Sequence, residues 1–299
     1  MISVIIPSYN SYKTIPRTID SLLSQPEAYV QEIIVVDSSD DEKTAEYLRS
    51  CRSERLRTVF LGQKTMPAIG RNIGAKEAKG QILAFIDSDA YAADDWAEQI
   101  LKVNEKGCRA AGGSISLPPE QENKGLALVQ YFLQFNEFSP YGLGRVADFA
   151  PSCNLFCERS LFEAVGGFPE IRASEDVLFG LAVNRREAFL FEPVIRVFHI
   201  FAESSSRFFS NQRMLGEYIL IYRRMHFKKS IYSGIIPLFL LPGFTAVKFY
   251  KICKRVFQTY PKPMIISFLK TLPLFLAGLF FWAWGFAGAC FKPNPPDVK

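Results

Sequence analysis

Acidic side chains follow the ends of two apolar segments in the first ninety residues, and their spacing suggests chemistry at a metal ion. Asp87-Ser88-Asp89 comes directly after Ile82–Ile86, and Asp37 comes directly after Glu32–Val36. Two carboxylates two residues apart at a strand end can project toward one hard cation that bridges diphosphate oxygens. Asp and Ser also favour turns and helix caps, so the triplet alone leaves a structural role open.

The segments around these carboxylates predict a sheet that gathers them. Apolar runs without alternation are separated by helical patterns up to about residue 110, which is typical of a parallel sheet covered on both faces. The expected strands are Ile2–Ile6, Glu32–Val36, Leu56–Leu61 and Ile82–Ile86, and the expected helices cover 15–23, 41–48 and 67–78. Ligands bind at the carboxyl ends of such strands. The sequence therefore predicts a doubly wound α/β domain.

The pattern loosens beyond residue 110, and we expect this part to build the second side of a cleft. The expected strands are Ala110–Leu117, Cys153–Cys157 and Val194–Phe201, and the expected helices are Leu126–Phe138 and Glu175–Arg186. The aromatic residues of 126–138 recur at helical spacing, which favours core packing. A lid over a lipid-linked acceptor is the alternative.

Composition and missing motifs disfavour several classes of protein. With 48% hydrophobic and 22% charged residues, the chain can bury a full core and is not disordered. Neither a dinucleotide-binding glycine fingerprint nor a phosphate-binding P-loop is present, and no nucleic-acid partner is expected. The six cysteines show no paired spacing, and Met1–Ile6 lacks the features of a signal peptide. We therefore expect a reducing compartment and a cytosolic N-terminus.

The last third of the chain differs in charge and hydropathy. Residues 1–200 carry 21 Lys/Arg and 27 Asp/Glu, whereas residues 201–299 carry 14 and 3. Uncharged stretches of 18 and 21 residues lie at Ser230–Val247 and Thr271–Phe291. At about 1.5 Å per residue, the second can cross a hydrocarbon core of about 30 Å, so we expect one transmembrane helix there. The first is marginal and contains two prolines.

Basic residues flank the first uncharged stretch on both sides. They are Arg223, Arg224, Lys228 and Lys229 before it, and Lys248, Lys251, Lys254, Arg255 and Lys262 after it. Because positive residues favour the cytoplasmic side, such a segment more naturally lies in the interface or re-enters than crosses. We expect a catalytic domain at 1–207, a basic amphipathic connector at 208–229 and a membrane-associated helical region at 230–299. Two buried helices of a soluble protein are the alternative.

Six segments, in order, resemble the inverting family-2 glycosyltransferases of the GT-A fold. They are Val4–Asn10, Ile33–Asp37, Gly70–Gly74, Ile82–Asp89, Gly166–Phe168 and Ser174–Asp176. The resemblance covers roughly residues 2–200. It implies a GT-A-type doubly wound, mainly parallel sheet, here followed by C-terminal membrane-associated helices.

The resemblance also implies a site for a nucleotide-sugar donor. Pro7 and Tyr9 would border the nucleotide base, and Asp37 would accept a hydrogen bond from it. Arg71 would lie near the diphosphate. The alternatives that need no ligand are a helix cap for Asp37 and a surface ion pair for Arg71. UDP is the commonest carrier in the family, while GDP and dTDP remain open.

A divalent cation, Mn²⁺ or Mg²⁺, is the cofactor that the resemblance implies. Asp89 would ligate it, and Asp87 would approach the ribose or the metal, with Ser88 between them in the donor site. His199 matches a position where many GT-A enzymes supply a further metal ligand, and imidazole suits Mn²⁺. The alternative for His199 is a histidine satisfied by the neighbouring backbone.

Asp176 would be the catalytic base. A sugar hydroxyl is a poor nucleophile, so a carboxylate within hydrogen-bond reach must take its proton as the bond to the anomeric carbon forms. A base and a metal on opposite sides of that carbon give single displacement with inversion. Glu175 and Asn154 would contact the acceptor. First-turn acids favoured by the helix dipole, and a buried turn amide, are the respective alternatives.

These expectations define a membrane-attached glycosyltransferase. It would move a sugar from a nucleotide-sugar donor, UDP-linked in the first instance, to a hydroxyl acceptor that is lipid-linked or destined for the cell envelope. Its catalytic domain would face the cytoplasm. The alternatives are a GT-A-like nucleotidyltransferase, which would release pyrophosphate, and a catalytically inactive nucleotide-binding membrane scaffold.

Overall fold

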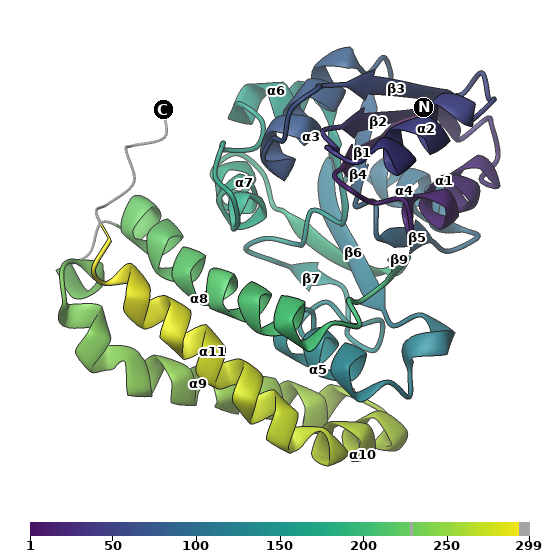
Figure 1. The fold of residues 1–299 in the computed structure, drawn as a ribbon. Coiled ribbons are helices and arrows are strands. Elements are labelled where there is room, and N and C mark those ends of the chain that lie inside the picture. The colour runs from purple at the N-terminus through teal and green to yellow at the C-terminus, as the bar shows by residue number, and fades with distance from the viewer. Residues whose placement is uncertain (228–229, 293–299) are drawn as a thin grey trace. The chain divides into compact units, whose positions relative to one another are not determined.

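The computed structural model describes residues 1–227 and 230–292, so Lys228, Lys229 and the end of the predicted membrane region lie outside the described residues. The chain forms two units (Figure 1). The sheet unit comprises Met1–Ser116 and Leu143–Ile200, and the helical unit comprises Leu117–Gly142 and Phe201–Lys299. The predicted boundary at residue 207 lies close to the third passage of the chain between the units, at residues 200–201. The sequence pattern did not predict that residues 117–142 belong to the helical unit.

One mixed sheet forms the centre of the sheet unit. Its strands are β1 (Ile2–Ser8), β2 (Val30–Asp37), β3 (Leu56–Phe60), β4 (Ile82–Ile86), β5 (Ala90–Ala92), β6 (Ala110–Ser116), β7 (Arg145–Val146), β8 (Asn154–Glu158) and β9 (Leu190–His199). The strand order is β3-β2-β1-β4-β8-β6-β9-β5, and β7 pairs with β9. Strands β1 to β4 are parallel to one another, as are β6 and β9, whereas β8, β5 and β7 pair antiparallel. The predicted GT-A-type α/β class is confirmed, with both parallel and antiparallel pairing beyond β4.

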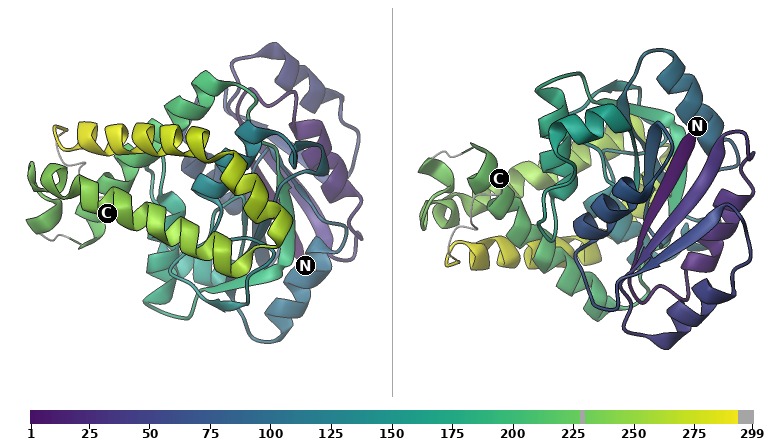
Figure 2. Two further views of the ribbon diagram at one scale, coloured as in Figure 1. Left: turned by 90° about the horizontal axis from the view of Figure 1, so that it is seen from below. Right: turned by 90° about the horizontal axis from the view of Figure 1, so that it is seen from above.

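Helices flank this sheet and hold the loops at its edge (Figure 2). They are α1 (Ile15–Leu23), α2 (Glu42–Ser50), α3 (Pro67–Glu77), α4 (Trp96–Glu105), α6 (Arg159–Val165) and α7 (Glu175–Asn184). Helix α3 packs tightly on β1, because a Cβ at Gly74 would lie 2.4 Å from Ile5 Cγ2 and one at Gly70 would lie 3.3 Å from Pro7 Cβ. The two glycines therefore bring the start of α3 against the end of β1.

The helical unit contains α5 (Gly125–Gln134), α8 (Ser205–Phe227), α9 (Ile236–Thr259), α10 (Lys262–Lys270) and α11 (Leu272–Ala289). Its core is rich in aromatic residues, including Phe132, Phe208, Phe268 and Phe275. The helix predicted for 126–138 ends at Gln134, and the next residues turn. Helix α9 does not stop where the uncharged stretch ends at Val247, but continues through the basic segment to Thr259.

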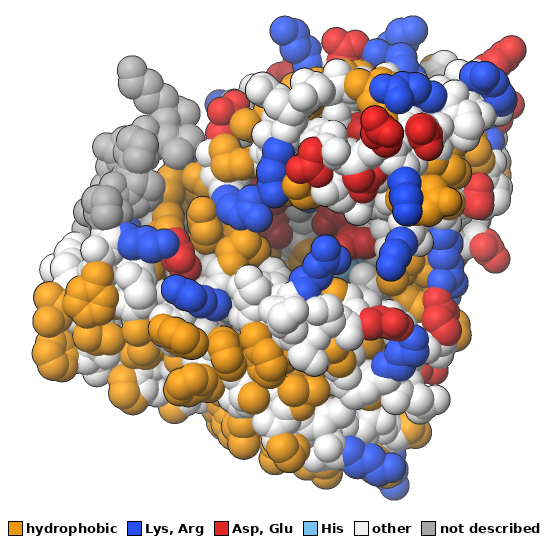
Figure 3. Space-filling model, viewed as in Figure 1, with side chains coloured by type: hydrophobic (Ala, Val, Ile, Leu, Met, Phe, Trp, Pro, Cys, Tyr) orange, Lys and Arg blue, Asp and Glu red, His pale blue; other side chains and the backbone are white. Residues whose placement is uncertain are grey.

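By length and composition, α9 and α11 are apolar enough to cross a membrane. Only 11% and 39% of their most apolar windows, respectively, are buried within the protein. Figure 3 shows hydrophobic side chains gathered over the helical unit, along the lower part of that view. This exposure disfavours the alternative of two buried helices in a soluble protein.

Candidate active site

A pocket of about 190 Å³ opens at the carboxyl ends of β1, β2 and β4. Its lining residues are Pro7, Ser8, Tyr9, Val36, Ser38, Thr65, Met66, Pro67, Gly70, Arg71, Asp87, Ser88 and Asp89. Of the residues predicted to bind donor or metal, this lining contains Pro7, Tyr9, Arg71, Asp87, Ser88 and Asp89. Residues from four separate loops thus meet at one edge of the sheet, where open α/β sheets bind ligands.

Asp37 forms part of the wall behind this pocket. Its carboxylate is buried and accepts hydrogen bonds from the Ser8 hydroxyl at 2.8 Å and the Ser39 hydroxyl at 2.7 Å. The cap of α2 is a different residue, because Asp41 Oδ1 accepts from the Thr44 N–H at 2.7 Å. The helix-cap alternative for Asp37 is therefore wrong. Asp37 fixes a hydroxyl that lines the pocket.

Tyr9 joins the loop after β1 to the loop after β2. Its hydroxyl donates to Asp40 Oδ2 at 2.9 Å, and Lys64 Nζ lies 4.1 Å from the centre of its ring. Hydrogen bonds from Asn10 and Tyr9 lower the pKa of Asp40 below its usual value. These contacts hold the aromatic face of Tyr9 at the pocket, and the flat face of a ring suits a nucleotide base.

Arg71 lies at the centre of a buried ion-pair network. Its guanidinium donates to Asp87 Oδ1 at 2.6 Å and to Glu175 Oε1 at 2.7 Å. Burial works against the charged form, but these two carboxylates outweigh it and raise the pKa of Arg71 above its usual value. Arg71 does form ion pairs, but they are buried, so the alternative of a surface ion pair is wrong. Arg71 links α3 to the end of β4 and the start of α7.

The first residues of α7 place two acids beside this network. Ser174, just before the helix, has a left-handed φ of +68°. Burial and the neighbouring Glu175 carboxylate raise the pKa of Asp176 to about 7, although a hydrogen bond from the Val177 N–H opposes the rise. Burial also raises the pKa of Glu175, against the opposing charge of Arg71. A carboxyl with a pKa near 7 is suited to general-base catalysis at neutral pH.

Asn72 is a positioning residue that sequence reasoning did not single out. Its amide donates to the Phe168 carbonyl at 2.8 Å and accepts from the Phe168 N–H at 2.9 Å. The preceding Gly166 and Gly167 have φ values of +85° and +73°, which favour glycine. Asn72 thereby ties the loop that leads to α7 onto α3. Asn72 lies inside the Gly70–Gly74 motif, and this position was the signal in the sequence that could have identified it.

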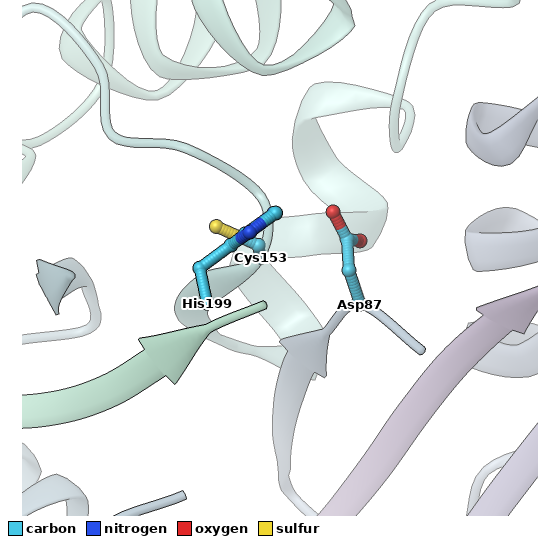
Figure 4. Close-up of side chains that lie close together, drawn as sticks. All are labelled: Asp87, Cys153 and His199. Atoms are coloured by element: carbon cyan, nitrogen blue, oxygen red, sulfur yellow. The ribbon is translucent and has the colours of Figure 1, made fainter. Parts of the chain in front are cut away.

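The end of β4, the start of β8 and the end of β9 bring possible metal ligands together (Figure 4). One ligand atom from each of Asp87, Cys153 and His199 lies within 4.8 Å of the other two. His199 Nε2 also lies 3.5 Å from Asp89 Oδ1. The predicted metal-binding residues Asp87, Asp89 and His199 therefore converge, whereas Cys153 was not predicted.

The donor atoms of this cluster fit a divalent cation. Carboxylate oxygens suit Mg²⁺, and carboxylate with imidazole suits Mn²⁺. Burial, together with the charges of Asp87 and Asp89, raises the pKa of the Cys153 thiol well above its usual value. Thiolate sulfur suits softer ions than Mg²⁺ or Mn²⁺. The set that fits the ion is thus Asp87, Asp89 and His199.

Asn154 has a different environment from the one expected of an acceptor-binding residue. Its side chain is buried, donates to the carbonyls of Ser114 and Ile195 at 2.8 and 2.9 Å, and accepts from Trp96 Nε1 at 2.9 Å. Every part of the amide is therefore used within the protein. This favours the buried-amide alternative, and we leave Asn154 out of the site proposed below.

The chain combines a GT-A-type mixed sheet with an acidic cluster after β4. Known proteins with these two features are the ones to compare it with. Residues 3–166, just over half of the chain, match the model of the glycosyl transferase family 2. The chain belongs to this family. The family resemblance carried by the six sequence segments is confirmed.

Relatives and solved structures agree with this assignment. Glycosyltransferase AglE of Haloferax volcanii is 28% identical over 173 residues, which cover 56% of this chain and 56% of AglE. The glucosyltransferase WfaP of Escherichia coli, described as a UDP-Glc:alpha-D-GlcNAc-diphosphoundecaprenol beta-1,3-glucosyltransferase, is 35% identical over 91 residues, covering 30% of this chain and 36% of WfaP. The chain thus spans about half the length of AglE and about a third of WfaP.

The mannosyltransferase PcManGT of Pyrobaculum calidifontis, solved in complex with GDP-Man and Mn²⁺, shares the fold. Its structure superposes with a TM-score of 0.62 and covers 96% of this chain and 85% of its own, at 17% sequence identity.

Proposed function

We propose that this chain is a metal-dependent glycosyltransferase that moves a sugar from a nucleotide-sugar donor to a hydroxyl acceptor. The observation that carries the proposal is the convergence of Asp87, Asp89, Arg71 and Asp176. Arg71 forms ion pairs with Asp87 and with Glu175, the residue that precedes Asp176, and Asp89 lies 3.5 Å from His199. One small region therefore combines metal ligands, a diphosphate-binding cation and a base.

The donor would bind in the pocket at the ends of β1, β2 and β4. Tyr9 and Pro7 would contact the nucleotide base, with Asp37 holding the Ser8 hydroxyl behind it. Arg71 would face the diphosphate, because this residue lines the pocket and its positive charge suits phosphate oxygens. The names of WfaP and PcManGT, which include UDP-Glc and GDP-Man, support a sugar nucleotide as donor, with UDP as the first candidate.

Asp87, Asp89 and His199 would hold a Mn²⁺ or Mg²⁺ ion. When bound, such an ion neutralises negative charge on the diphosphate leaving group. The presence of Mn²⁺ in the PcManGT complex supports the same class of ion here. Arg71, held by Asp87 and Glu175, would stabilise the same leaving group from the protein side.

Asp176 would act as the base in a single displacement. Its carboxylate accepts the proton of the acceptor hydroxyl while that oxygen forms a bond to the anomeric carbon. The bond from this carbon to the diphosphate oxygen breaks, and its electron pair leaves with the nucleoside diphosphate. One displacement inverts the anomeric configuration. Glu175 would serve mainly to position Arg71, since its carboxylate is engaged with the guanidinium.

The helical unit would attach the enzyme to a membrane and bring it near a lipid-linked acceptor. The exposed apolar surface of α9 and α11, together with the basic residues between them, favours attachment to an anionic bilayer. The diphosphoundecaprenol acceptor in the name of WfaP supports a lipid-linked or envelope-destined acceptor. Sugar nucleotides are made in the cytosol, so the sheet unit would lie on that side.

A panel of nucleotide sugars tests this function. Purified full-length chain would be heated with UDP-glucose, UDP-N-acetylglucosamine or GDP-mannose, each with Mn²⁺ or with EDTA. We expect one nucleotide class to raise the melting temperature only when Mn²⁺ is present. Stabilisation by none of them would contradict the proposal. Release of pyrophosphate, in place of a nucleoside diphosphate, on incubation with acceptor lipids would favour the nucleotidyltransferase alternative.

A further inference from the structure

Helix α8 lies along α11 over nearly its whole length, and both helices belong to the helical unit. At one end, a Cβ at Gly278 would lie 2.6 Å from Phe208 Cζ. In the middle, a Cβ at Gly216 would lie 1.8 Å from the Trp282 carbonyl oxygen, and one at Gly285 would lie 1.8 Å from the Arg213 carbonyl oxygen. The two backbones are therefore in direct contact, so α11 cannot enter a bilayer without α8.

Helix α8 carries charge along this contact. Its charged residues are Arg207, Arg213, Glu217, Arg223 and Arg224. The Arg213 guanidinium lies 5.0 Å from the centre of the Trp284 ring, and Glu217 forms an ion pair with Lys292. Arg224 donates to the Ala289 carbonyl at 2.9 Å. A crossing α11 would carry these charges through the hydrocarbon, where charged side chains are strongly disfavoured.

The outer face of the same helices is apolar. On α11, Leu276, Phe280 and Trp284 are exposed and recur every four residues, so they form one stripe facing away from the core. The exposed large hydrophobic residues of α9 and α10 are Ile236, Phe239, Leu240, Val247, Tyr250, Phe257, Ile266 and Leu269. Large apolar side chains exposed on three successive helices favour an apolar partner.

Lysines border this surface. Lys251 and Lys254 are exposed on α9, and Lys262 and Lys270 are exposed at the two ends of α10. Lys251 follows Tyr250 and Lys270 follows Leu269, while Lys254 lies about one helical turn before Phe257. A helix with an apolar face and a lysine border is typical of segments that lie in the plane of a membrane interface and bind anionic lipids.

We propose that α9, α10 and α11 lie in the plane of one leaflet of an anionic membrane and do not cross it. Leu276 and Phe280 enter the acyl region, and the lysines contact lipid phosphates. Trp284, with the Arg213 guanidinium 5.0 Å from its ring, lies at the level of the headgroups, and α8 keeps its charges out of the acyl region. Both ends of α11 are then on the same side of the bilayer. This topology rests on the proposed membrane attachment and makes it specific.

Labelling from one side of the membrane tests the topology. Lys270→Cys and Phe291→Cys place a thiol at each end of α11, and the unsubstituted chain, whose six cysteines are buried or half-buried, is the blank. In sealed inside-out membrane vesicles, an impermeant maleimide should label both variants equally. Labelling of only one variant would overturn the in-plane topology while leaving attachment intact. Recovery of the chain in the soluble fraction would instead overturn the proposed attachment.

Vesicle binding tests the surface itself. Phe280→Glu, in the exposed stripe, should weaken binding to phosphatidylglycerol vesicles at least tenfold, whereas Phe60→Glu on β3 should leave it unchanged. Replacing Lys251, Lys254, Lys262 and Lys270 by Gln, one after another, should reduce binding about fivefold per lysine at low salt. Circular dichroism would establish that each variant is folded. Equal binding of the Phe280→Glu variant and the unsubstituted chain would overturn the proposal, as would equal binding to neutral and anionic vesicles.

Discussion

The guanidinium of Arg71 donates to the carboxylate of Glu175 at 2.7 Å, although the two residues are 104 positions apart in the sequence. Both side chains are buried, and the pair holds the start of α7 against α3. Asp176 is the next residue along α7, so the position of the proposed base depends on this contact. One ion pair thereby couples the residue proposed to bind the diphosphate, Arg71, to the proposed base.

Removing one member of this pair should destabilise the sheet unit. Glu175→Ala leaves the buried guanidinium with one carboxylate fewer, and breaking a buried ion pair costs about 3–5 kcal/mol in the free energy of unfolding. Glu77→Ala is the matched control, since its ion pair with Arg57 is exposed and should contribute at most about 1 kcal/mol. Urea unfolding followed by circular dichroism measures both. Equal losses in the two variants would show that the Arg71–Glu175 pair is not formed in solution.

The rate of transfer should depend on pH through Asp176. Its pKa is raised to about 7, and only the ionised form can accept a proton, so kcat/KM should fall about tenfold per pH unit below 7 and level off above it. In the Asp176→Asn variant, kcat should fall about 10²- to 10⁴-fold, and kcat/KM should no longer follow this pKa. Asp94→Asn, an exposed residue before α4, is the control. An unchanged pH profile in the Asp176→Asn variant would remove this residue as the base.

Metal activation should depend on the ends of β4 and β9. His199→Ala and Asp89→Ala each remove one ligand from the proposed set, so the Mn²⁺ concentration for half-maximal activity should rise at least about tenfold. The control is His226→Ala, which changes the other histidine of the chain, on α8. Mn²⁺ titration with paramagnetic resonance detection of the free ion provides a readout independent of turnover. Unaltered Mn²⁺ binding in both ligand variants would place the ion elsewhere.

The α8–α11 contact should be sensitive to a single methyl group. Gly216→Ala introduces a Cβ where the Trp282 carbonyl oxygen lies, so we expect a loss of about 1–3 kcal/mol in stability. Gly243→Ala, in α9, meets no atom within 4 Å and should be neutral or stabilising by up to about 1 kcal/mol, because alanine favours a helix. Thermal unfolding of purified chain in mild detergent compares the two. Equal melting temperatures would mean that α8 and α11 are apart in solution.

The parallel half of the sheet was predictable because its signals are local. Strand β4 is an apolar run that ends directly at Asp87, and it was predicted with the bounds that the structure has. The start of α7 at Glu175 was also predicted, although the helix ends at Asn184 and not at Arg186. In each case the residues that define the element are adjacent in the sequence, so no tertiary information was required.

Other features depend on contacts between distant segments and gave no local signal. Strands β5 and β7 are three and two residues long and exist because β9 pairs with them. Cys153 lies beside Asp87 and His199 only after β8 and β9 have entered the sheet. Residues 117–142 belong to the helical unit because α5 shares its aromatic core, a relationship that periodicity within α5 cannot reveal.

Calorimetric titration of UDP and GDP into the full-length chain, with Mn²⁺ or with EDTA, is the most direct test of a donor site built from Arg71, Asp87, Asp89 and His199. The proposed site predicts that one of the two nucleotides binds, that binding requires Mn²⁺, and that Asp89→Ala weakens it at least tenfold while Asp176→Asn retains it. Binding that is equally tight in EDTA, or that Asp89→Ala leaves unchanged, would contradict the central proposal.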